Sequence, residues 1–269
     1  MSSSFLSRHG LLDIPDPALN RYPLLNSHWS TTIILVSYLI IVLKLGRKFM
    51  EHRNPYNLKK ILIVYNSIQV IYNAILFGYA AYYILINSPY DRRCLVSLPY
   101  DHPEKQAERF LTYAYYINKL LDLCDTIFFI LRKSYKQITT LHVYHHVMMP
   151  FFVYWTIRLH GFGGQYAVMG LFNTFVHMVM YFYYLISAMN PGIKSSLWWK
   201  KYITKLQMVQ FILLLLQSLY ILLFYPACKV PLVMQYLQLV VATTMILMFS
   251  NFYYHCYMKP KPQKDVKQE

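Results

Sequence analysis

Leu141-His142-Val143-Tyr144-His145-His146 opens an apolar run that continues to Ile157. On a helix its three histidines occupy positions i, i+3 and i+4, so their imidazoles share one face. The apolar run suggests that this face lies at membrane depth, where ionisable side chains are costly and usually serve a function. The alternative is that the histidines cap the cytosolic end of a helix. Polar groups at matching depth in other apolar segments favour the functional interpretation.

The composition is typical of a membrane protein. Of 269 residues, 57% are hydrophobic and only 14% are charged, and the apolar residues form long blocks. The formal net charge of +15 would suit a nucleic-acid-binding protein. However, the basic residues fall in short loops between the apolar blocks, where orientation in the membrane explains them. We therefore expect the bilayer and phosphate-bearing ligands as partners, and no nucleic acid.

The apolar blocks predict an all-α membrane protein with seven transmembrane helices. We place these helices at roughly Trp29–Leu45, Ile61–Ile86, Phe110–Leu131, Leu141–Ile157, Val168–Ser187, Ile203–Phe224 and Leu232–Tyr254. One membrane domain would thus cover residues 29–257, between an N-terminal segment of residues 1–28 and a basic tail of residues 258–269. The first 26 residues contain no continuous apolar segment of the kind found in a cleaved signal peptide.

The distribution of basic residues predicts the orientation of the chain. Lysines and arginines accumulate in the first, third and fifth loops and in the tail, whereas acidic residues offset those of the second loop. Since basic loops face the cytosol, the N-terminus should be lumenal and the C-terminus cytosolic.

The same orientation places Cys94 and Cys228 in lumenal loops, Cys124 within the third span and Cys256 near a cytosolic end. An oxidising lumen then favours a disulfide between Cys94 and Cys228. Two free loop thiols are the alternative.

The predicted spans also carry polar residues at helical spacing. They are Asn66, Gln69 and Asn73 in the second span, Lys119, Asp122, Asp125 and Thr126 in the third, Asn173, His177, Tyr181 and Tyr184 in the fifth, and Thr204, Gln207 and Gln210 in the sixth. Individually, the amides fit helix–helix hydrogen bonding equally well. Together with buried charges and histidines, they predict the lining of a cavity that opens toward the basic cytosolic side.

Three functions are compatible with this lining, because imidazole can act as a nucleophile, a base or a metal ligand. A desaturase or hydroxylase would bind two irons, but His142, His145, His146 and His177, with His255 at a span end, are few ligands for that. A transporter would use Lys119, Asp122 and Asp125 as an ion relay, yet no inverted repeat or interrupted span is visible. A membrane acyltransferase would attack a thioester with a histidine, and the basic mouth would bind coenzyme A.

Four motifs resemble, in the same order, those of the animal ELO family, the proteins for elongation of very long chain fatty acids. Lys119-Leu-Leu-Asp122-Leu-Cys-Asp125-Thr126 resembles KxxExxDT, with an aspartate in place of the family's glutamate. His142-Val-Tyr-His145-His146 matches HxxHH. The stretches from Asn173 to Tyr184 and from Thr204 to Phe211 match NxxxHxxMYxYY and TxxQxxQF.

The resemblance implies a very-long-chain 3-oxoacyl-CoA synthase, an acyltransferase of the endoplasmic reticulum membrane. Such enzymes condense long-chain acyl-CoA with malonyl-CoA and release CO₂ and CoA, as the first, rate-setting step of the elongation cycle. No cofactor or metal is implied. Six helices should enclose a narrow acyl-chain tunnel. The ketoreductase, dehydratase and enoyl reductase of the cycle, and a second copy in a homodimer, are the protein partners it suggests.

The resemblance also assigns roles to individual residues. His145 would form an acyl-imidazole, His177 would assist proton transfer or polarise the carbonyl, and His142 and His146 would orient them. Asp122 and Asp125 would set imidazole tautomer and basicity, while Asn173 and the glutamines would donate to the thioester oxygen. Substrate binding would involve Lys119, Thr126, Arg132, Tyr181, Tyr184, Lys200, Lys201, Thr204, Gln207 and Gln210.

An acyl chain held at His145 should run away from the charged mouth, because each buried methylene contributes about 0.8 kcal/mol. Phe152 lies seven residues past His145 on the same helix face. Met169 lies one turn on the lumenal side of Asn173, and Tyr166 about one turn beyond. These bulky residues are candidates for the closed end of the tunnel, with ordinary helix packing as the alternative.

Overall fold

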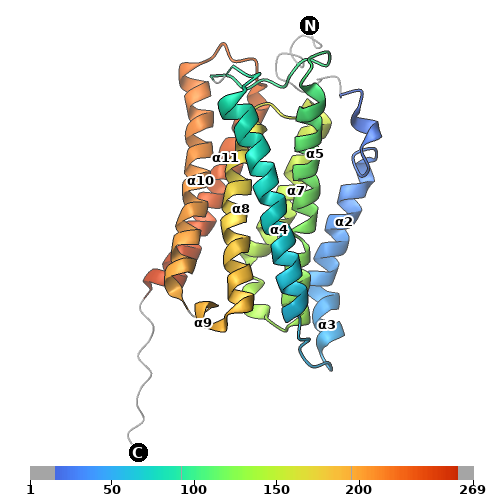
Figure 1. Cartoon of the computed structure of the whole chain (residues 1–269), viewed down its shortest axis with the longest axis vertical. Coiled ribbons are helices and arrows are strands. Elements are labelled where there is room, and N and C mark those ends of the chain that lie inside the picture. Colours follow the sequence, from blue (N-terminus) through green and yellow to red (C-terminus); the bar gives the residue numbers. More distant parts are fainter. Residues whose placement is uncertain (1–15, 92, 195, 260–269) are drawn as a thin grey trace, which may run out of the picture.

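The computed structural model describes residues 16–91, 93–194 and 196–259, and within these ranges it contains helices and no β-strand. The long helices run side by side along the molecule (Figure 1). In chain order the elements are η1 Leu19–Arg21, α2 His28–Ile40, η2 Ile41–Leu45, α3 Gly46–Met50, α4 Lys59–Ala81, η3 Tyr82–Ile86, α5 Lys105–Leu121, α6 Cys124–Leu131, η4 Tyr135–Gln137, α7 Thr140–His160, α8 Tyr166–Met189, α9 Pro191–Lys194, α10 Leu197–Phe224, α11 Leu232–Tyr253 and η5 Tyr254–Met258.

Five helical segments of the described chain are long and apolar enough to cross a membrane. They are Trp29–Met50, Lys59–Ile86, Tyr166–Met189, Leu197–Phe224 and Leu232–Met258. Helices α5, α6 and α7 are not among them, and these helices carry Lys119, Asp125 and the histidines His142, His145 and His146, respectively. The all-helical prediction is therefore confirmed, whereas seven membrane crossings remain a prediction.

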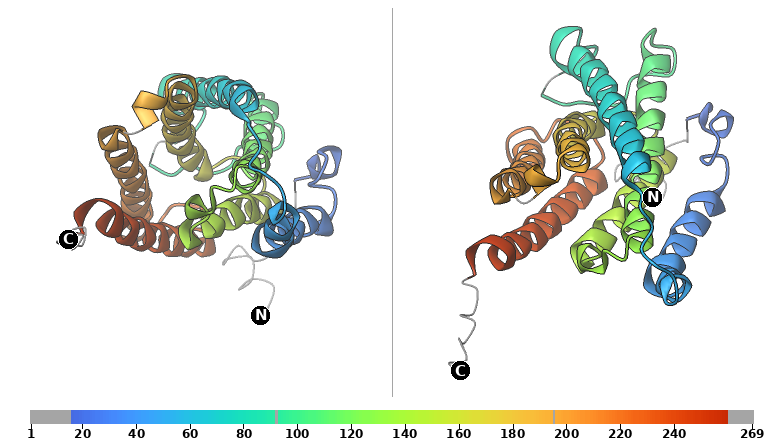
Figure 2. Two further views of the ribbon diagram at one scale, coloured as in Figure 1. Left: turned by 90° about the horizontal axis from the view of Figure 1, so that it is seen from below. Right: turned by 60° about the horizontal axis from the view of Figure 1, so that its bottom comes forward.

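The helices form a closed ring. Helix α4 packs against α8, α8 against α10, α10 against α11, α11 against α7, α7 against α5, and α5 against α4. The left view of Figure 2 shows this ring end on, with α2 and α3 outside it. Helix α2 packs on α7, and α3 packs on α6. The arrangement is compatible with the expected six-helix enclosure, and the acyl tunnel itself remains a prediction.

The third predicted span is not one continuous helix. Helix α5 ends at Leu121 and α6 begins at Cys124. Between them the hydrogen bonds tighten, since the Leu123 amide donates to the Leu120 carbonyl (3.2 Å) and the Asp125 amide to the Asp122 carbonyl (3.2 Å). The break coincides with the carboxylate of Asp122, which side chains of three helices hold, and the expectation of an unbroken Phe110–Leu131 helix is wrong here.

Local sequence sets both ends of α7. The side chain of Thr139 accepts a hydrogen bond from the amide of His142 (3.2 Å), so the helix begins at Thr140 and the histidines occupy its first two turns. Pro150 has no amide hydrogen, so it cannot donate to the carbonyl of His146 one turn earlier. The helix ends at His160 and is followed by Gly161, whose φ of 85° favours glycine.

The two ends of the ring differ in chemistry. At one end a disulfide joins Cys94, before α5, to Cys228, between α10 and α11, with 5.4 Å between the Cα atoms. Cys124 and Cys256 are free. We call this the disulfide end, comprising the loops 87–104, 161–165 and 225–231. The opposite, basic end comprises the loops 51–58, 132–139 and 190–196.

Candidate active site

Lys119 on α5 is the centre of a buried polar cluster. Its Nζ donates to Asp122 Oδ2 (2.7 Å) and to Asn173 Oδ1 (2.9 Å), and lies 3.3 Å from His177 Nδ1. All four residues are buried. Residues of the third and fifth predicted spans therefore meet through one ammonium group.

The carboxylate of Asp122 is held from several sides. Its Oδ1 accepts from Gln69 Nε2 (3.0 Å) and from the Tyr181 hydroxyl (2.9 Å), and its Oδ2 lies 3.4 Å from His177 Nδ1. These contacts offset the cost of burying a charge. The Tyr181 hydroxyl also lies 2.7 Å from Asp125 Oδ2. Because a phenol has one hydrogen, both contacts are hydrogen bonds only when one of the carboxyls carries a proton.

The histidines of α7 form a row beside this cluster. The rings of His142 and His146 are 4.1 Å apart, those of His146 and His145 5.6 Å, and those of His145 and His177 6.3 Å. His142 Nε2 lies 2.8 Å from Thr126 Oγ1. His145 is half-buried and has no hydrogen-bond partner among the described residues. The row therefore places a ring with free nitrogens next to His177.

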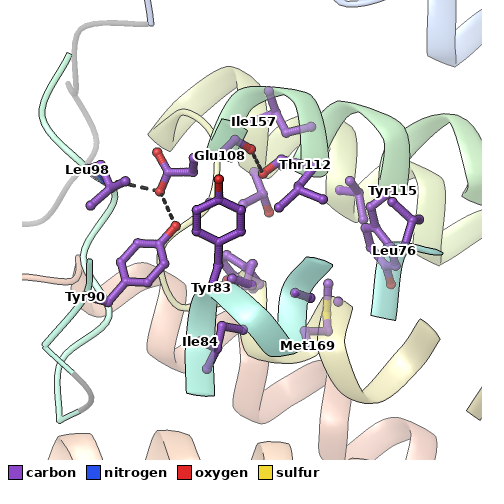
Figure 3. A pocket seen from close by; sticks show the side chains of 18 of the residues that line it. Leu76, Tyr83, Ile84, Tyr90, Leu98, Glu108, Thr112, Tyr115, Ile157 and Met169 are labelled. Atoms are coloured by element: carbon purple, nitrogen blue, oxygen red, sulfur yellow. Dashed lines mark hydrogen bonds between the residues drawn. The ribbon is translucent and has the colours of Figure 1, made fainter. Parts of the chain in front are cut away.

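An apolar pocket lies between α4, α5, α7 and α8 and reaches the disulfide end (Figure 3). Tyr115 and Met169 line it near the cluster, and Tyr83, Tyr90 and Glu108 line its far part. The empty space within it amounts to about 820 Å³, a figure that includes space open to the outside. A smaller cavity lies between α7, α8, α10 and α11.

Residues 23–265 match the family model for ELO, the GNS1/SUR4 family. The chain belongs to the ELO family. It is 42% identical over 248 residues to very long chain fatty acid elongase F of Drosophila melanogaster, covering 92% of this chain and 96% of that protein. It is 36% identical to very long chain fatty acid elongase 7 of Rattus norvegicus (91% and 86% covered) and 35% identical to very long chain fatty acid elongase 1 of Mus musculus (94% and 90% covered). The resemblance drawn from the four motifs is confirmed.

The geometry of this ELO protein gives the iron interpretation no support. In the part of the chain that the structure describes, no three histidine, cysteine, aspartate or glutamate side chains are arranged to hold a metal ion. An ammonium group lies 3.3 Å from His177 Nδ1, where a cation would be repelled. The Thr126 hydroxyl lies 2.8 Å from Nε2 of His142, so this nitrogen already has a hydrogen-bond partner in the place of a metal ion.

The residues predicted on the sixth span lie on α10. Gln207 Nε2 contacts the Met180 sulfur (3.9 Å), and Gln210 lines the smaller cavity. No hydrogen bond among the described residues joins either amide to a histidine. The Thr204 hydroxyl donates to the carbonyl of Lys200 (2.9 Å) within α10. Matching depth in the sequence therefore did not imply contact.

The remaining predicted residues lie at the edge of the cluster, at the basic end and along the two cavities. The Tyr184 ring lies 5.9 Å from that of Tyr181, at the edge of the cluster. Arg132, Lys200 and Lys201 are partly exposed at the basic end. Tyr166 and Met169 line the larger pocket, and Phe152 and Met169 line the smaller one, so Met169 borders both.

Sequence reasoning missed the tyrosines that support the cluster. The Tyr115 hydroxyl donates to Asn173 Oδ1 (3.0 Å), and Tyr38 reaches Thr126 from outside the ring (2.7 Å). The chain contains 27 tyrosines, so the residue type alone carries no signal. Only the packing of the helices reveals which tyrosines reach the site.

Proposed function

We propose that this ELO protein is a very-long-chain 3-oxoacyl-CoA synthase that works through a histidine acyl-enzyme. The observation that supports the proposal best is the position of His145. It is half-buried, it lacks a hydrogen-bond partner among the described residues, and Nδ1 of its neighbour His177 lies within 3.4 Å of both Lys119 Nζ and Asp122 Oδ2. The apolar pocket that begins near the same cluster is suited to an acyl chain.

In the first half-reaction a ring nitrogen of His145 attacks the thioester carbonyl of acyl-CoA. The carbon–nitrogen bond forms and the carbon–sulfur bond breaks. The departing thiolate takes the hydrogen of the imidazole and leaves as CoA, so the product is a neutral acyl-imidazole. A neutral nucleophile and a dry pocket favour this step, since no free charge has to be buried.

In the second half-reaction malonyl-CoA loses CO₂, and the electron pair of the broken carbon–carbon bond remains on the thioester as an enolate. The enolate carbon attacks the acyl carbonyl, and the bond to His145 breaks. The imidazole then takes up one proton, and 3-oxoacyl-CoA, longer by two carbons, is released. One proton is thus consumed in each cycle.

The other residues hold His177 in one state. Since an ammonium group can only donate, its contact with His177 Nδ1 leaves the ring hydrogen on Nε2. That Nε2–H can donate to the thioester oxygen as negative charge develops there. Asp122 compensates the charge of Lys119, and Asn173 accepts from both Lys119 and Tyr115.

The proposal includes a location in the cell. Seven spans within residues 29–257 of the endoplasmic reticulum membrane would place residues 1–28 in the lumen and the tail 258–269 in the cytosol. The basic end, with Arg132, Lys200 and Lys201, would meet the phosphates of the CoA substrates. Residues 1–15 and 260–269 lie outside the described part of the chain. The 3-oxo product requires a ketoreductase, a dehydratase and an enoyl reductase, and a homodimer is the expected assembly.

The test uses purified protein and separates the two half-reactions. Acyl-CoA alone should leave an acyl mass on His145 and release CoA, and later addition of malonyl-CoA should yield 3-oxoacyl-CoA and CO₂. His145→Ala should reduce condensation by ~10³-fold or more while the protein stays folded. CoA release only in the presence of malonyl-CoA would overturn the covalent intermediate. Stoichiometric iron in active protein would overturn the acyltransferase in favour of an iron enzyme.

A further inference from the structure

Helix α2 lies outside the ring, yet one of its side chains reaches the histidine row. The Tyr38 hydroxyl lies 2.7 Å from Thr126 Oγ1, which in turn lies 2.8 Å from His142 Nε2. Tyr38 is 4% exposed and Thr126 is fully buried. Among the described residues, neither hydroxyl has another hydrogen-bond partner. The three groups thus form one linear chain from α2 through α6 to α7.

Counting hydrogens gives this chain a direction. The Thr126 hydroxyl has one hydrogen, so it donates to one neighbour and accepts from the other. If His142 donated and Thr126 passed its hydrogen to Tyr38, the phenol hydrogen would be buried without an acceptor, which is costly. In the opposite direction both hydroxyl hydrogens have an acceptor. Tyr38 therefore donates to Thr126, and Thr126 donates to His142 Nε2.

The direction determines the state of His142. A neutral imidazole that accepts at Nε2 carries its hydrogen on Nδ1. The ring of His142 lies 4.1 Å from that of His146, which lies 5.6 Å from that of His145. We propose that Tyr38 is a positioning residue, which acts through Thr126 to hold one tautomer and one orientation of His142 at the end of the histidine row.

The α2 interface offers a matched control. The Thr31 hydroxyl on α2 lies 2.6 Å from that of Tyr116 on α5, which is also a buried tyrosine–threonine contact. The Tyr116 ring contacts Tyr113 and Tyr154 rather than a histidine. Loss of either phenol hydroxyl removes one contact between α2 and the ring, but only the loss at Tyr38 reaches the histidines.

The inference rests on the proposed function only through its kinetic readout. Tyr38→Phe should lower kcat for condensation by roughly 10–100-fold with little change in KM, as loss of a group that orients a histidine does. Tyr116→Phe should change kcat by less than about 2-fold. The two variants should lower the Tm by similar amounts, because each loses one buried hydroxyl contact. Equal kinetic effects in the two variants would overturn the inference.

Variants of Thr126 sharpen the test. Thr126→Val should reproduce the effect of Tyr38→Phe, and Thr126→Ser, which keeps the hydroxyl, should restore most of the activity. The double variant Tyr38→Phe/Thr126→Val should be no slower than Thr126→Val alone, because both changes break the same chain. Additive losses would mean that Tyr38 acts by another route.

A readout independent of catalysis separates failure of the inference from failure of the proposed function. A wild-type protein without condensation activity would overturn the function alone. Diethyl pyrocarbonate modification of His142, measured by mass spectrometry, should then still be several-fold faster in Tyr38→Phe than in Tyr116→Phe. Unchanged modification together with unchanged kcat would remove any role for Tyr38.

Discussion

Helix α5 and the residue that follows it, Asp122, contain two lysine–carboxylate pairs that look alike in sequence. Lys105 and Glu108 are three residues apart, as are Lys119 and Asp122. Both pairs are buried, and in both the lysine nitrogen lies 2.7 Å from a carboxylate oxygen. Their surroundings differ, and the difference indicates what each pair does.

The pair at the disulfide end is held by backbone amides as well as by side chains, and Lys105 Nζ also donates to the Ser97 hydroxyl (2.9 Å). Glu108 Oε1 accepts from the Tyr90 hydroxyl (2.9 Å) and from the amides of Leu98 and Gly164 (3.2 Å each), of which Figure 3 shows the first two. Burial and the Glu108 carboxylate raise the pKa of Tyr90, so this hydroxyl stays a donor. The pair therefore fixes three loop positions.

The neighbouring glycine turn fits this structural role. Gly163 has a φ of 78°, and a side chain there would collide with the Glu108 carboxylate. The loop between α7 and α8 can therefore close over Glu108 only with glycine at this position.

The pair in the ring interior is held by side chains alone. Gln69, Asn173, His177 and Tyr181 contact Lys119 or Asp122. Nearby, Asn118 Oδ1 and His146 Nδ1 are buried without a partner among the described residues. Unsatisfied polar atoms are rare in protein interiors and call for an explanation. Because the interior pair lies among these atoms and the predicted catalytic residues, we assign it to chemistry and the other pair to stability.

Replacing each lysine by methionine tests the comparison directly, and Lys119→Met should have the largest effect. Loss of the ammonium group removes the donor to Asn173 and His177, so condensation should fall by ~10³-fold or more in the protein that remains folded. The measurement is kcat per folded molecule in detergent. Retention of more than about a tenth of the activity would contradict the assignment of this pair to chemistry.

Lys105→Met should act on stability instead. Removing one partner of a buried ion pair typically costs about 3–5 kcal/mol, because the Glu108 charge is left uncompensated. We expect a large fall in thermal stability with kcat per folded molecule nearly unchanged. A variant with normal stability but low kcat would show that the two pairs are not separate in function.

Removing the disulfide, which lies at the same end as the Lys105–Glu108 pair, should have a somewhat smaller effect on stability. Cys94→Ser should lower stability by about 2–5 kcal/mol, since the bridge links positions 134 residues apart. The matched control is Cys256→Ser, an exposed free thiol whose loss should change little. Denaturation in the absence of reductant measures both. Mass spectrometry of unreduced peptides that finds alkylatable Cys94 and Cys228 would rule out the bridge.

Motif spacing predicted the residues that meet through Lys119, because side chains one helical turn apart share a face. It did not predict the helix break at Asp122, since that break depends on contacts from Gln69 on α4 and Tyr181 on α8. Spacing also could not separate Gln210 from the cluster, because neighbouring helices at one depth can face different cavities. Tyr38 and Tyr115 belong to no spaced motif, so only the packing identifies them.

The smallest expected effect concerns the two cavities between the helices. Met169 borders both cavities, whereas Phe152 borders only the smaller one. Met169→Ala should join the cavities and let a longer chain fit, with about 0.8 kcal/mol gained for each additional buried methylene. Its longest product should therefore exceed that of Phe152→Ala.

The control is Met50→Ala, which truncates a fully buried methionine that packs with residues of α2 and α6. That change should cost about 2–5 kcal/mol of stability and leave the product ladder unchanged. The product ladders of the three variants, compared with wild type, decide between the alternatives. If Met169→Ala loses activity uniformly and its longest product stays the same, Met169 packs helices and the chain stops elsewhere.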